Sequence, residues 1–548
     1  MKIATHLVTL CFSLLLNVSF LAQGKSPAAR HLRLTVGIVV DQMRNEYIYR
    51  YWNRFGNGGF KRLVNQGFYF RNTHYNYIPT YTGPGHASIY TGTTPRQHGI
   101  IANEWFQKNS AVKTGCVQDS LVKPVGSRGR SGMASPRLLL SSTISDELKL
   151  SSNGRSKVYS ISLKDRSAIL PAGHAADGAF WMDDATGEFC SSSWYLADLP
   201  RWLKNFNDER LPRQYLEKWW STLYPIETYS ASCSDENKYE AVPNRKDFPV
   251  FPYEYKSFIE KGDFSIIRFT PFGNSLVKDL ALECLVKEEL GKDDTPDLLC
   301  LSFSSTDYIG HAYGPRSVEM EDTYLRLDKD LEDLLNRLDK EVGKGQYLVF
   351  LTADHGAAEV PMQMNEWKIP GGYSRETKLL RDIRKYFLSV YGDSNLVTGV
   401  CNDQVFLNEK RIEVARFDKD ALEEKLCAFI LTTPGMAEAY PSRILRYNGF
   451  PDNDPRTLVQ NGFNNQLSGN VCYVLKPGWM EYAEKGTTHG SSYDYDTHIP
   501  LLFYGNAIQG GESMRRHNIT QIAPSICELM RINRPNSSTP ELLEELFR

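Results

Sequence analysis

Six side chains that can bind metal ions stand out in the sequence, each in a turn or close to the end of an apolar run. They are Asp41, Asp307, His311, Asp354, His355 and His489. Three carboxylates and three imidazoles divide naturally into two sets that suit paired zinc ions, whereas calcium would require more oxygen ligands. Two metal ions about 3.5 to 4 Å apart can hold the attacking and leaving oxygens of an in-line displacement at phosphorus. The six residues therefore predict a two-zinc site for phosphoryl transfer.

Each of these residues, taken alone, also fits an ordinary structural role. Asp307 and His311 can converge on one cation if they share a helical turn, but a capping acid and a surface histidine fit the same spacing. Asp354 and His355 could form a buried hydrogen-bonded pair. Asp41 could be a helix cap, and His489 could be a surface residue. Only the six together favour the metal site.

A candidate nucleophile lies in the stretch IPTYTGPGHASIYTG, residues 78–92. Thr80 and Thr82 stand between two prolines, and ASIYTG is typical of the start of a helix. A hydroxyl at the amino end of a helix, beside a zinc ion, loses its proton more easily than a free threonine. The helix end would also favour phosphoryl charge. Either threonine could instead simply cap that helix.

Two cations in SLKDRS could bind the substrate anion. Lys164 and Arg166 are two residues apart at the end of a predicted strand, which predicts side chains on the same side. Arg166 can bind a phosphoryl group with two parallel donors, and Lys164 as a point charge. Two extra cations favour a dianionic monoester over a monoanionic diester. A solvated basic pair is the alternative.

The elements that must position these residues alternate between strands and helices. Near-continuous apolar runs, typical of buried strands, lie at Leu32–Arg44, Lys157–Arg166, Asp297–Asp307, Tyr347–Gly356 and His498–Gly505. Helical patterns occupy Ser141–Leu150, Ser317–Gly343 and Ile519–Met530. This alternation predicts an α/β fold with a doubly wound, mainly parallel sheet, which binds ligands at the carboxyl ends of its strands. Two segments break this alternation and are predicted to be inserted cap segments: about 181–266, which is rich in Trp, Tyr, Pro and Asn, and about 361–486, which mixes helical and irregular stretches.

The N-terminus and the charge balance limit location and partners. Residues 1–24, with Lys2 before an apolar run from Leu7 to Ala22, predict a secretory signal peptide, and a short membrane anchor is the alternative. The 63 basic and 65 acidic residues give a formal charge of −2, so neither nucleic acid nor an anionic membrane is expected as the main partner.

Cysteine spacing argues against a cysteine zinc site, because no C-x-x-C pair occurs. Cys300 and Cys527 lie in apolar runs and are predicted core residues. Export would favour oxidised pairs among some of Cys116, Cys190, Cys233, Cys284, Cys401, Cys427 and Cys472.

Seven motifs in order resemble the alkaline phosphatase superfamily: VVDQMR, PTYTGPGH, HGIIAN, SLKDRS, STDYIGH, TADHGA and KGTTHGSSYDYDTHIPLLFYG. Within it the chain resembles the PafA-type secreted bacterial alkaline phosphatases, relatives of the nucleotide pyrophosphatase/phosphodiesterases. The resemblance covers residues 31–548 as one catalytic domain, and implies a three-layer sandwich with a mainly parallel central sheet. It also implies a periplasmic or secreted monomer without a membrane span.

The resemblance implies a role for each site residue. Thr82, the second threonine of P-T-x-T, would be the covalent nucleophile, and Asn103 would donate to a phosphoryl oxygen; an ordinary turn residue is the alternative for Asn103. One zinc ion, which activates the nucleophile, would be held by Asp41, Asp354 and His355. A second zinc ion, which binds the hydrolytic water, would be held by Asp307, His311 and His489.

The expected activity is hydrolysis of a broad range of phosphate monoesters through a phosphothreonine intermediate, since the K-x-R element of Lys164 and Arg166 marks the monoesterases of the superfamily. Two alternatives stay open. One is a phosphodiesterase or nucleotide pyrophosphatase of the same fold. The other is an exported metal-binding or carbohydrate-binding protein without catalytic activity.

Overall fold

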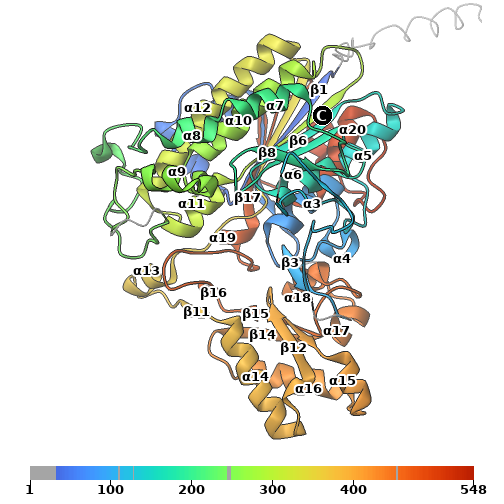
Figure 1. Ribbon diagram of the computed structural model, residues 1–548. Helices are drawn as coiled ribbons and strands as arrows, with labels where there is room; N and C mark the ends of the chain where they lie inside the picture. Colours follow the sequence, from blue (N-terminus) through green and yellow to red (C-terminus); the bar gives the residue numbers. More distant parts are fainter. Residues whose placement is uncertain (1–31, 109–111, 128, 244–247, 452–453, 548) are drawn as a thin grey trace, which may run out of the picture.

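The computed structural model of the 548-residue chain describes residues 32–108, 112–127, 129–243, 248–451 and 454–547. The predicted signal peptide, residues 1–24, lies outside the described residues. Figure 1 shows a large body that contains the central sheet and a smaller lobe beside it.

The main sheet contains 11 strands of the described chain. In spatial order they are β18 (Gly511–Ser513), β2 (Phe68–His74), β17 (His498–Gly505), β10 (Tyr347–Thr352), β1 (Leu34–Val40), β9 (Asp297–Phe303), β6 (Val158–Ser162), β7 (Gly178–Met182), β8 (Phe189–Ser192) and β5 (Pro124–Val125), with β19 (His517–Asn518) beside β2. The neighbours from β10 to β7 are parallel, whereas β17 and β8 run antiparallel to the strands beside them. The predicted mainly parallel sheet is confirmed, and the last predicted strand, His498–Gly505, is an antiparallel member.

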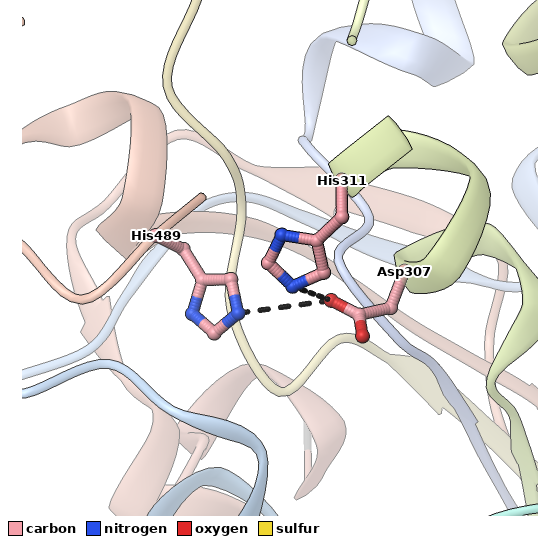
Figure 2. Close-up of side chains that lie close together, drawn as sticks. All are labelled: Asp307, His311 and His489. Atoms are coloured by element: carbon pink, nitrogen blue, oxygen red, sulfur yellow. Dashed lines mark ion pairs between the residues drawn. The ribbon is translucent and has the colours of Figure 1, made fainter. Parts of the chain in front are cut away.

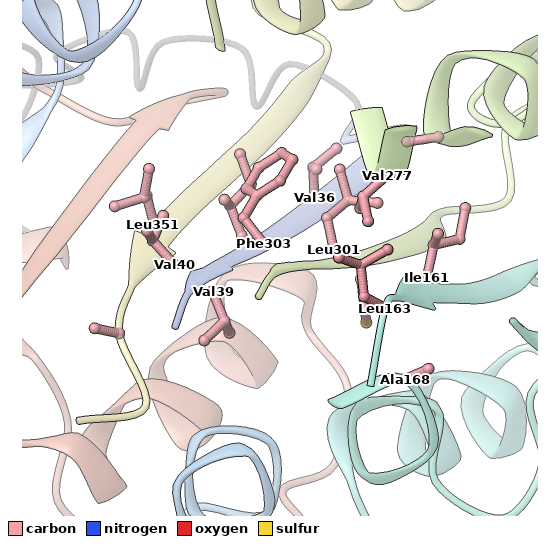
Figure 3. Packing of buried hydrophobic residues seen from close by; sticks show 14 of the residues in the cluster. Val36, Val39, Val40, Ile161, Leu163, Ala168, Val277, Leu301, Phe303 and Leu351 are labelled. Atoms are coloured by element: carbon pink, nitrogen blue, oxygen red, sulfur yellow. The ribbon is translucent and has the colours of Figure 1, made fainter. Parts of the chain in front are cut away.

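The central strands are apolar along their length because they are covered on both faces. Every residue of β1, β9 and β10 is buried. Ile38 of β1 pairs with Leu351 of β10 on one side and with Leu301 of β9 on the other. Figure 3 shows side chains of these strands packed together with Val277 and Ala168 from two of the covering helices.

Helices form a layer on each side of the sheet (Figure 1). One layer contains α3 (Thr82–Thr91), α5 (Ile144–Ser151), α6 (Asp165–Ala172) and α20 (Ile522–Met530). The other contains α2 (Phe60–Gln66), α7 (Arg201–Asp208), α8 (Leu211–Leu216), α10 (Phe272–Lys287) and α12 (Val318–Leu338). Ser317 caps α12 by accepting from Met320 N, and a π-helical turn, Asp339–Gly343, continues α12 to the predicted stop at Gly343. The three-layer α/β fold is confirmed.

Residues 181–266, predicted to be an inserted cap segment, contribute to the main body. The segment begins in β7, supplies β8, α7, α8 and α9 (Lys256–Lys261), and buries Trp181, Trp202 and Trp220 in the main hydrophobic core. Its aromatic residues, which suggested an irregular insertion, are core residues that anchor these elements.

Most of residues 361–486 forms the lobe, which has its own sheet and core. The sheet contains β12 (Val397–Cys401), β13 (Gln404–Leu407), β15 (Val471–Leu475) and β14 (Met436–Pro441), all antiparallel to their neighbours. Helices α14 (Glu376–Tyr391), α15 (Glu409–Val414) and α16 (Lys419–Ile430) contribute Phe387, Ile412 and Leu426 to a separate apolar cluster. Most of residues 361–486, predicted to be an inserted cap segment, therefore forms a separate structural unit.

The nine cysteines of the described chain are all free thiols, eight of them buried, so the prediction of oxidised pairs is wrong for this structure. Burial raises the pKa of thiols such as Cys116 to about 12. No helix among the described residues is both long and apolar enough to cross a membrane.

Candidate active site

Adjacent strands of the sheet bring most of the predicted ligands to one edge. Asp41 directly follows β1, and Asp354 and His355 come shortly after the end of the neighbouring β10. On the other side of β1, strand β9 leads into α11 (Ser305–Tyr313), which carries Asp307 and His311 one turn apart. Because these strands are parallel, their carboxyl ends meet at this edge.

Thr82 is the first residue of α3, five positions earlier than the helix start predicted at ASIYTG. Its side chain is buried, and Oγ1 lies 3.4 Å from Lys164 Nζ and 3.5 Å from His355 Nε2. Thr80 Oγ1 donates to the carbonyl oxygen of Ser491, and the N-cap position belongs to Tyr81. Neither threonine caps the helix, so the capping alternative is wrong.

Two groups of three side chains could each hold a metal ion, with ligand atoms within 4.8 Å of one another. The first is Asp307, His311 and His489 (Figure 2), where Asp307 Oδ1 lies 3.1 Å from His311 Nε2 and 3.6 Å from His489 Nε2. The second group consists of Asp41, Asp307 and His355. Asp307 is thus common to both groups. Asp354, predicted to share an ion with Asp41 and His355, lies beside the second group, with Oδ2 3.6 Å from His355 Nε2.

All three histidines are oriented as metal ligands usually are. In each ring Nδ1 lies within hydrogen-bond distance of a backbone carbonyl, so Nδ1 carries the proton that it donates and Nε2 faces the carboxylates. The pairs are His311 with Thr487 (2.7 Å), His489 with Thr80 (2.6 Å) and His355 with Gly356 (3.0 Å). Burial lowers the pKa of His355, and burial together with the neighbouring imidazoles lowers that of His489, so both favour the neutral form that binds metal. Burial alone would lower the pKa of His311, but the charge of Asp307 raises it above the usual value.

Two carboxylate oxygens in the site accept no hydrogen bond from the described residues. They are Oδ1 of Asp41 and Oδ2 of Asp354, both fully buried. Burial raises the pKa of Asp41 well above its usual range, and the nearby charges of Asp307 and Asp354 add to this. A buried carboxylate oxygen without a donor favours a cation beside it. The donor set therefore fits divalent metal ions.

Lys164 and Arg166 do not lie at the end of a strand, as the sequence predicted. Strand β6 ends at Ser162, and Lys164 is the N-cap of α6, so strand alternation does not set their directions. The buried Lys164 ammonium lies 2.6 Å from both Asp41 Oδ2 and Asp307 Oδ2. Burial alone would lower its pKa, but the charges of these carboxylates raise it above the usual value.

Arg166 has few protein contacts by comparison. Its side chain is 24% exposed, and the carboxylate that pairs with it, Asp165, lies 3.7 Å away. Its Nε–H is buried and has no acceptor among the described residues. An unused buried donor of this kind is suited to an anionic ligand.

A hollow of about 630 Å³ lies beside these residues and is lined by Asn103 and Arg166. The side-chain amide oxygen of Asn103, Oδ1, accepts from Gly83 N at 2.8 Å, at the amino end of α3. This bond orients the amide and leaves its nitrogen as a donor. The hollow also contacts Cys116, Gln118 and Arg130, and its volume suits a small organic molecule.

Sequence reasoning missed two residues that hold the site together. Gln42 adopts a left-handed backbone (φ 63°), and its Nε2 donates to Asp307 Oδ1 at 2.7 Å while its N–H donates to Asp354 Oδ1 at 3.2 Å. His86, one turn after Thr82, places Nδ1 2.9 Å from the Thr82 carbonyl oxygen and 3.3 Å from Asp354 Oδ2. The available signals were adjacency to Asp41 for Gln42 and the four-residue spacing from Thr82 for His86.

Known proteins of the same kind match nearly the whole chain. The profile of the family described as "Type I phosphodiesterase / nucleotide pyrophosphatase" matches residues 35–497. Alkaline phosphatase PhoV of Synechococcus elongatus is 42% identical over 94% of this chain and 93% of its own length, and alkaline phosphatase PafA of Elizabethkingia meningoseptica is 40% identical over 96% of each. The crystal structure of wild-type PafA superposes with a TM-score of 0.92 at 39% identity, covering 94% of this chain and 99% of that one. The chain therefore belongs to the type I phosphodiesterase / nucleotide pyrophosphatase family and, within it, to the PafA-like alkaline phosphatases, as the resemblance predicted.

Proposed function

We propose that this alkaline phosphatase hydrolyses phosphate monoesters by transferring the phosphoryl group to Thr82. The observation that carries the proposal is the placement of one buried hydroxyl, Thr82 Oγ1, at the amino end of a helix, beside Lys164 and beside His355 of the second candidate metal group. Relatives about 40% identical over nearly the full chain are named alkaline phosphatases, which supports the same chemistry.

We infer that the metal ions are two zinc ions. Asp41, Asp354 and His355 would hold one, and Asp307, His311 and His489 the other; the mixture of oxygen and neutral nitrogen donors supports zinc. Bound zinc would lower the pKa of the Thr82 hydroxyl and offset negative charge on the leaving oxygen. The position of Asp307 in both ligand groups also brings the two sets of ligands close together.

The residues of the chain supply the remaining steps of the proposed reaction. Thr82 Oγ attacks phosphorus, a bond from Oγ to phosphorus forms, and the bond to the leaving alcohol oxygen breaks, giving phosphothreonine. Lys164 Nζ, 3.4 Å from Oγ1, stabilises the deprotonated hydroxyl by its charge. The proton lost by the Thr82 hydroxyl is balanced by the one that the leaving alcohol oxygen gains. Water then attacks the phosphorus of phosphothreonine, the bond from Oγ to phosphorus breaks, inorganic phosphate is released, and Thr82 Oγ regains a proton as the water loses one.

Binding of the transferred group falls to the side chains that face the hollow. The amide nitrogen of Asn103 and the guanidinium of Arg166 would donate to oxygens of the phosphoryl group, where charge spreads in the transition state. Lys164 adds a second positive charge close by. Because a monoester is a dianion and a diester a monoanion, this pair of cations supports monoester hydrolysis.

The proposed location is the periplasm or the exterior of the cell, supported by the apolar run from Leu7 to Ala22 behind Lys2. A monomer is the expected state. N-terminal sequencing and gel filtration of protein recovered from the periplasm or the medium test both, and an intact N-terminus with retention in the membrane fraction would favour an anchor.

The test of function combines zinc analysis with a comparison of two substrates. Purified protein is expected to hold two zinc ions per chain and to give a higher kcat/KM for an aryl phosphate monoester than for the matched diester. A clear diester preference would instead support a phosphodiesterase. No turnover at any zinc loading would support a binding protein without catalytic activity.

A further inference from the structure

We propose that Asn402, in the lobe, is a positioning residue for Asn103. This inference rests on the proposed function, in which the Asn103 amide binds the transferred phosphoryl group. Asn402 Nδ2 donates to the carbonyl oxygen of Glu104 at 2.5 Å. Glu104 directly follows Asn103, so the bond fixes the backbone next to the substrate-binding side chain.

The segment that carries Asn103 needs outside support. Strands β3 (Glu104–Phe106) and β4 (Lys113–Gly115) form a two-stranded sheet separate from the main sheet. A two-stranded hairpin is marginally stable alone, so its packing determines its position. Trp105 anchors one side in the core of the main body. The other side faces the lobe.

Contacts between this hairpin and the lobe are close. Phe106 packs against Phe406 of β13 with ring centroids 5.6 Å apart. A Cβ atom added at Gly399 of β12 would lie 2.4 Å from the Phe106 ring, so glycine permits this approach. The lobe therefore supports the hairpin with an aromatic contact and, through Asn402, with a directed hydrogen bond.

Asn402 is itself held firmly in the lobe. It forms, with Asp403, the tight turn between β12 and β13, and both residues have left-handed backbones (φ 54° and 56°), which Asn and Asp tolerate. Its N–H donates to Glu376 Oε1 at 2.7 Å, and the N–H of Glu376 donates to Glu481 Oε2 at 2.7 Å. The side chain thus extends from a fixed turn to the neighbouring hairpin.

Loss of the Asn402 bond is expected to affect catalysis because the hydrogen bonds of Asn103 depend on the position of its backbone. Its backbone carbonyl accepts from Cys116 N, and its side-chain Oδ1 accepts from Gly83 N, both at 2.8 Å. These bonds aim the amide nitrogen only if the backbone stays in place. Loss of the bond to Glu104 would let the amide shift, and misplacement by a fraction of an ångström weakens transition-state contacts.

A double-mutant cycle tests this coupling. Asn402→Gly removes the amide but keeps a residue that adopts the left-handed turn. With an aryl phosphate monoester, Asn402→Gly is expected to lower kcat/KM by about five-fold in the wild-type background, the loss of one hydrogen bond. In the Asn103→Ala background the same change is expected to have an effect below about two-fold. Equal losses in both backgrounds, or no loss in the wild type, would overturn the proposal.

Asn408→Ala is the matched control in the same lobe. Asn408 Oδ1 accepts from Arg411 N and caps α15, so its loss weakens the lobe without removing the bond to Glu104. The kcat/KM of the Asn408→Ala variant is expected to stay within about two-fold of the wild-type value. A loss as large as that of Asn402→Gly would attribute the effect to general loosening of the lobe and overturn the proposal. Wild-type turnover of the monoester separates failure of this inference from failure of the proposed function.

Discussion

Replacing Arg166 with alanine is expected to reduce hydrolysis of phosphate monoesters more than that of diesters. The side chain is a clean target because its ion-pair partner, Asp165, is 40% exposed and tolerates the loss. Lys164 is a poorer target, since its removal would strip two buried carboxylates, Asp41 and Asp307, of a partner at 2.6 Å.

The magnitude follows from the charge on the substrate. A hydrogen bond from a charged donor contributes about 1.5 to 3 kcal/mol, so its loss lowers monoester kcat/KM by about 10- to 150-fold. A diester carries half the charge, so the Coulombic loss is about half as large, or about 3- to 12-fold. The ratio of monoester to diester kcat/KM should therefore fall by about 3- to 12-fold.

The assay compares kcat/KM for an aryl phosphate monoester and its methyl diester, with wild-type and Arg166→Ala protein at equal zinc content. Arg130→Ala is the control, because Arg130 lines the same hollow and tests a general change of charge. That variant is expected to leave the ratio unchanged. Equal losses on both esters with Arg166→Ala would refute the reasoning from substrate charge.

Three further predictions concern the nucleophile, the metal ions and the thiols. Thr82→Ala is expected to lower monoester turnover by about 10⁴-fold or more while zinc content is kept; activity within ten-fold of wild type would exclude Thr82 as the nucleophile. Asp307→Ala should lower zinc content more than His311→Ala, measured by elemental analysis, because Asp307 is the only carboxylate of its proposed zinc set and also lies among the candidate ligands of the other. Equal zinc losses in the two variants would refute this ranking. A reductant should leave the Tm unchanged, because the nine described cysteines are free thiols; a fall of several degrees would reveal a disulfide.

The sequence predicted the central strands well because a buried strand has a recognisable local pattern. A strand covered on both faces is apolar throughout, so β1, β9 and β10 were recognisable, and the polar residues that follow them fall at one sheet edge. Because ligands bind at the carboxyl ends of parallel strands, the polar residues that follow these strands could be predicted to lie close together.

Features that depend on tertiary packing could not be read in the same way. Trp181, Trp202 and Trp220 suggested an irregular insertion because aromatic residues among prolines and asparagines carry no helical or strand period, yet all three are core residues. The direction of Lys164 depends on where β6 ends, and the start of α3 at Thr82 was hidden by two glycines and a proline. The contact of Gln42 with Asp307 joins residues far apart in the chain and has no local pattern.

The central claim, transfer through Thr82, is tested most directly by the stereochemical course at phosphorus. A monoester made chiral with three oxygen isotopes is hydrolysed in the presence of an acceptor alcohol, and the configuration of the transferred phosphoryl group is determined. Two in-line displacements, the first by Thr82 and the second by the acceptor, predict overall retention of configuration. Inversion would show a single direct displacement and would contradict the account.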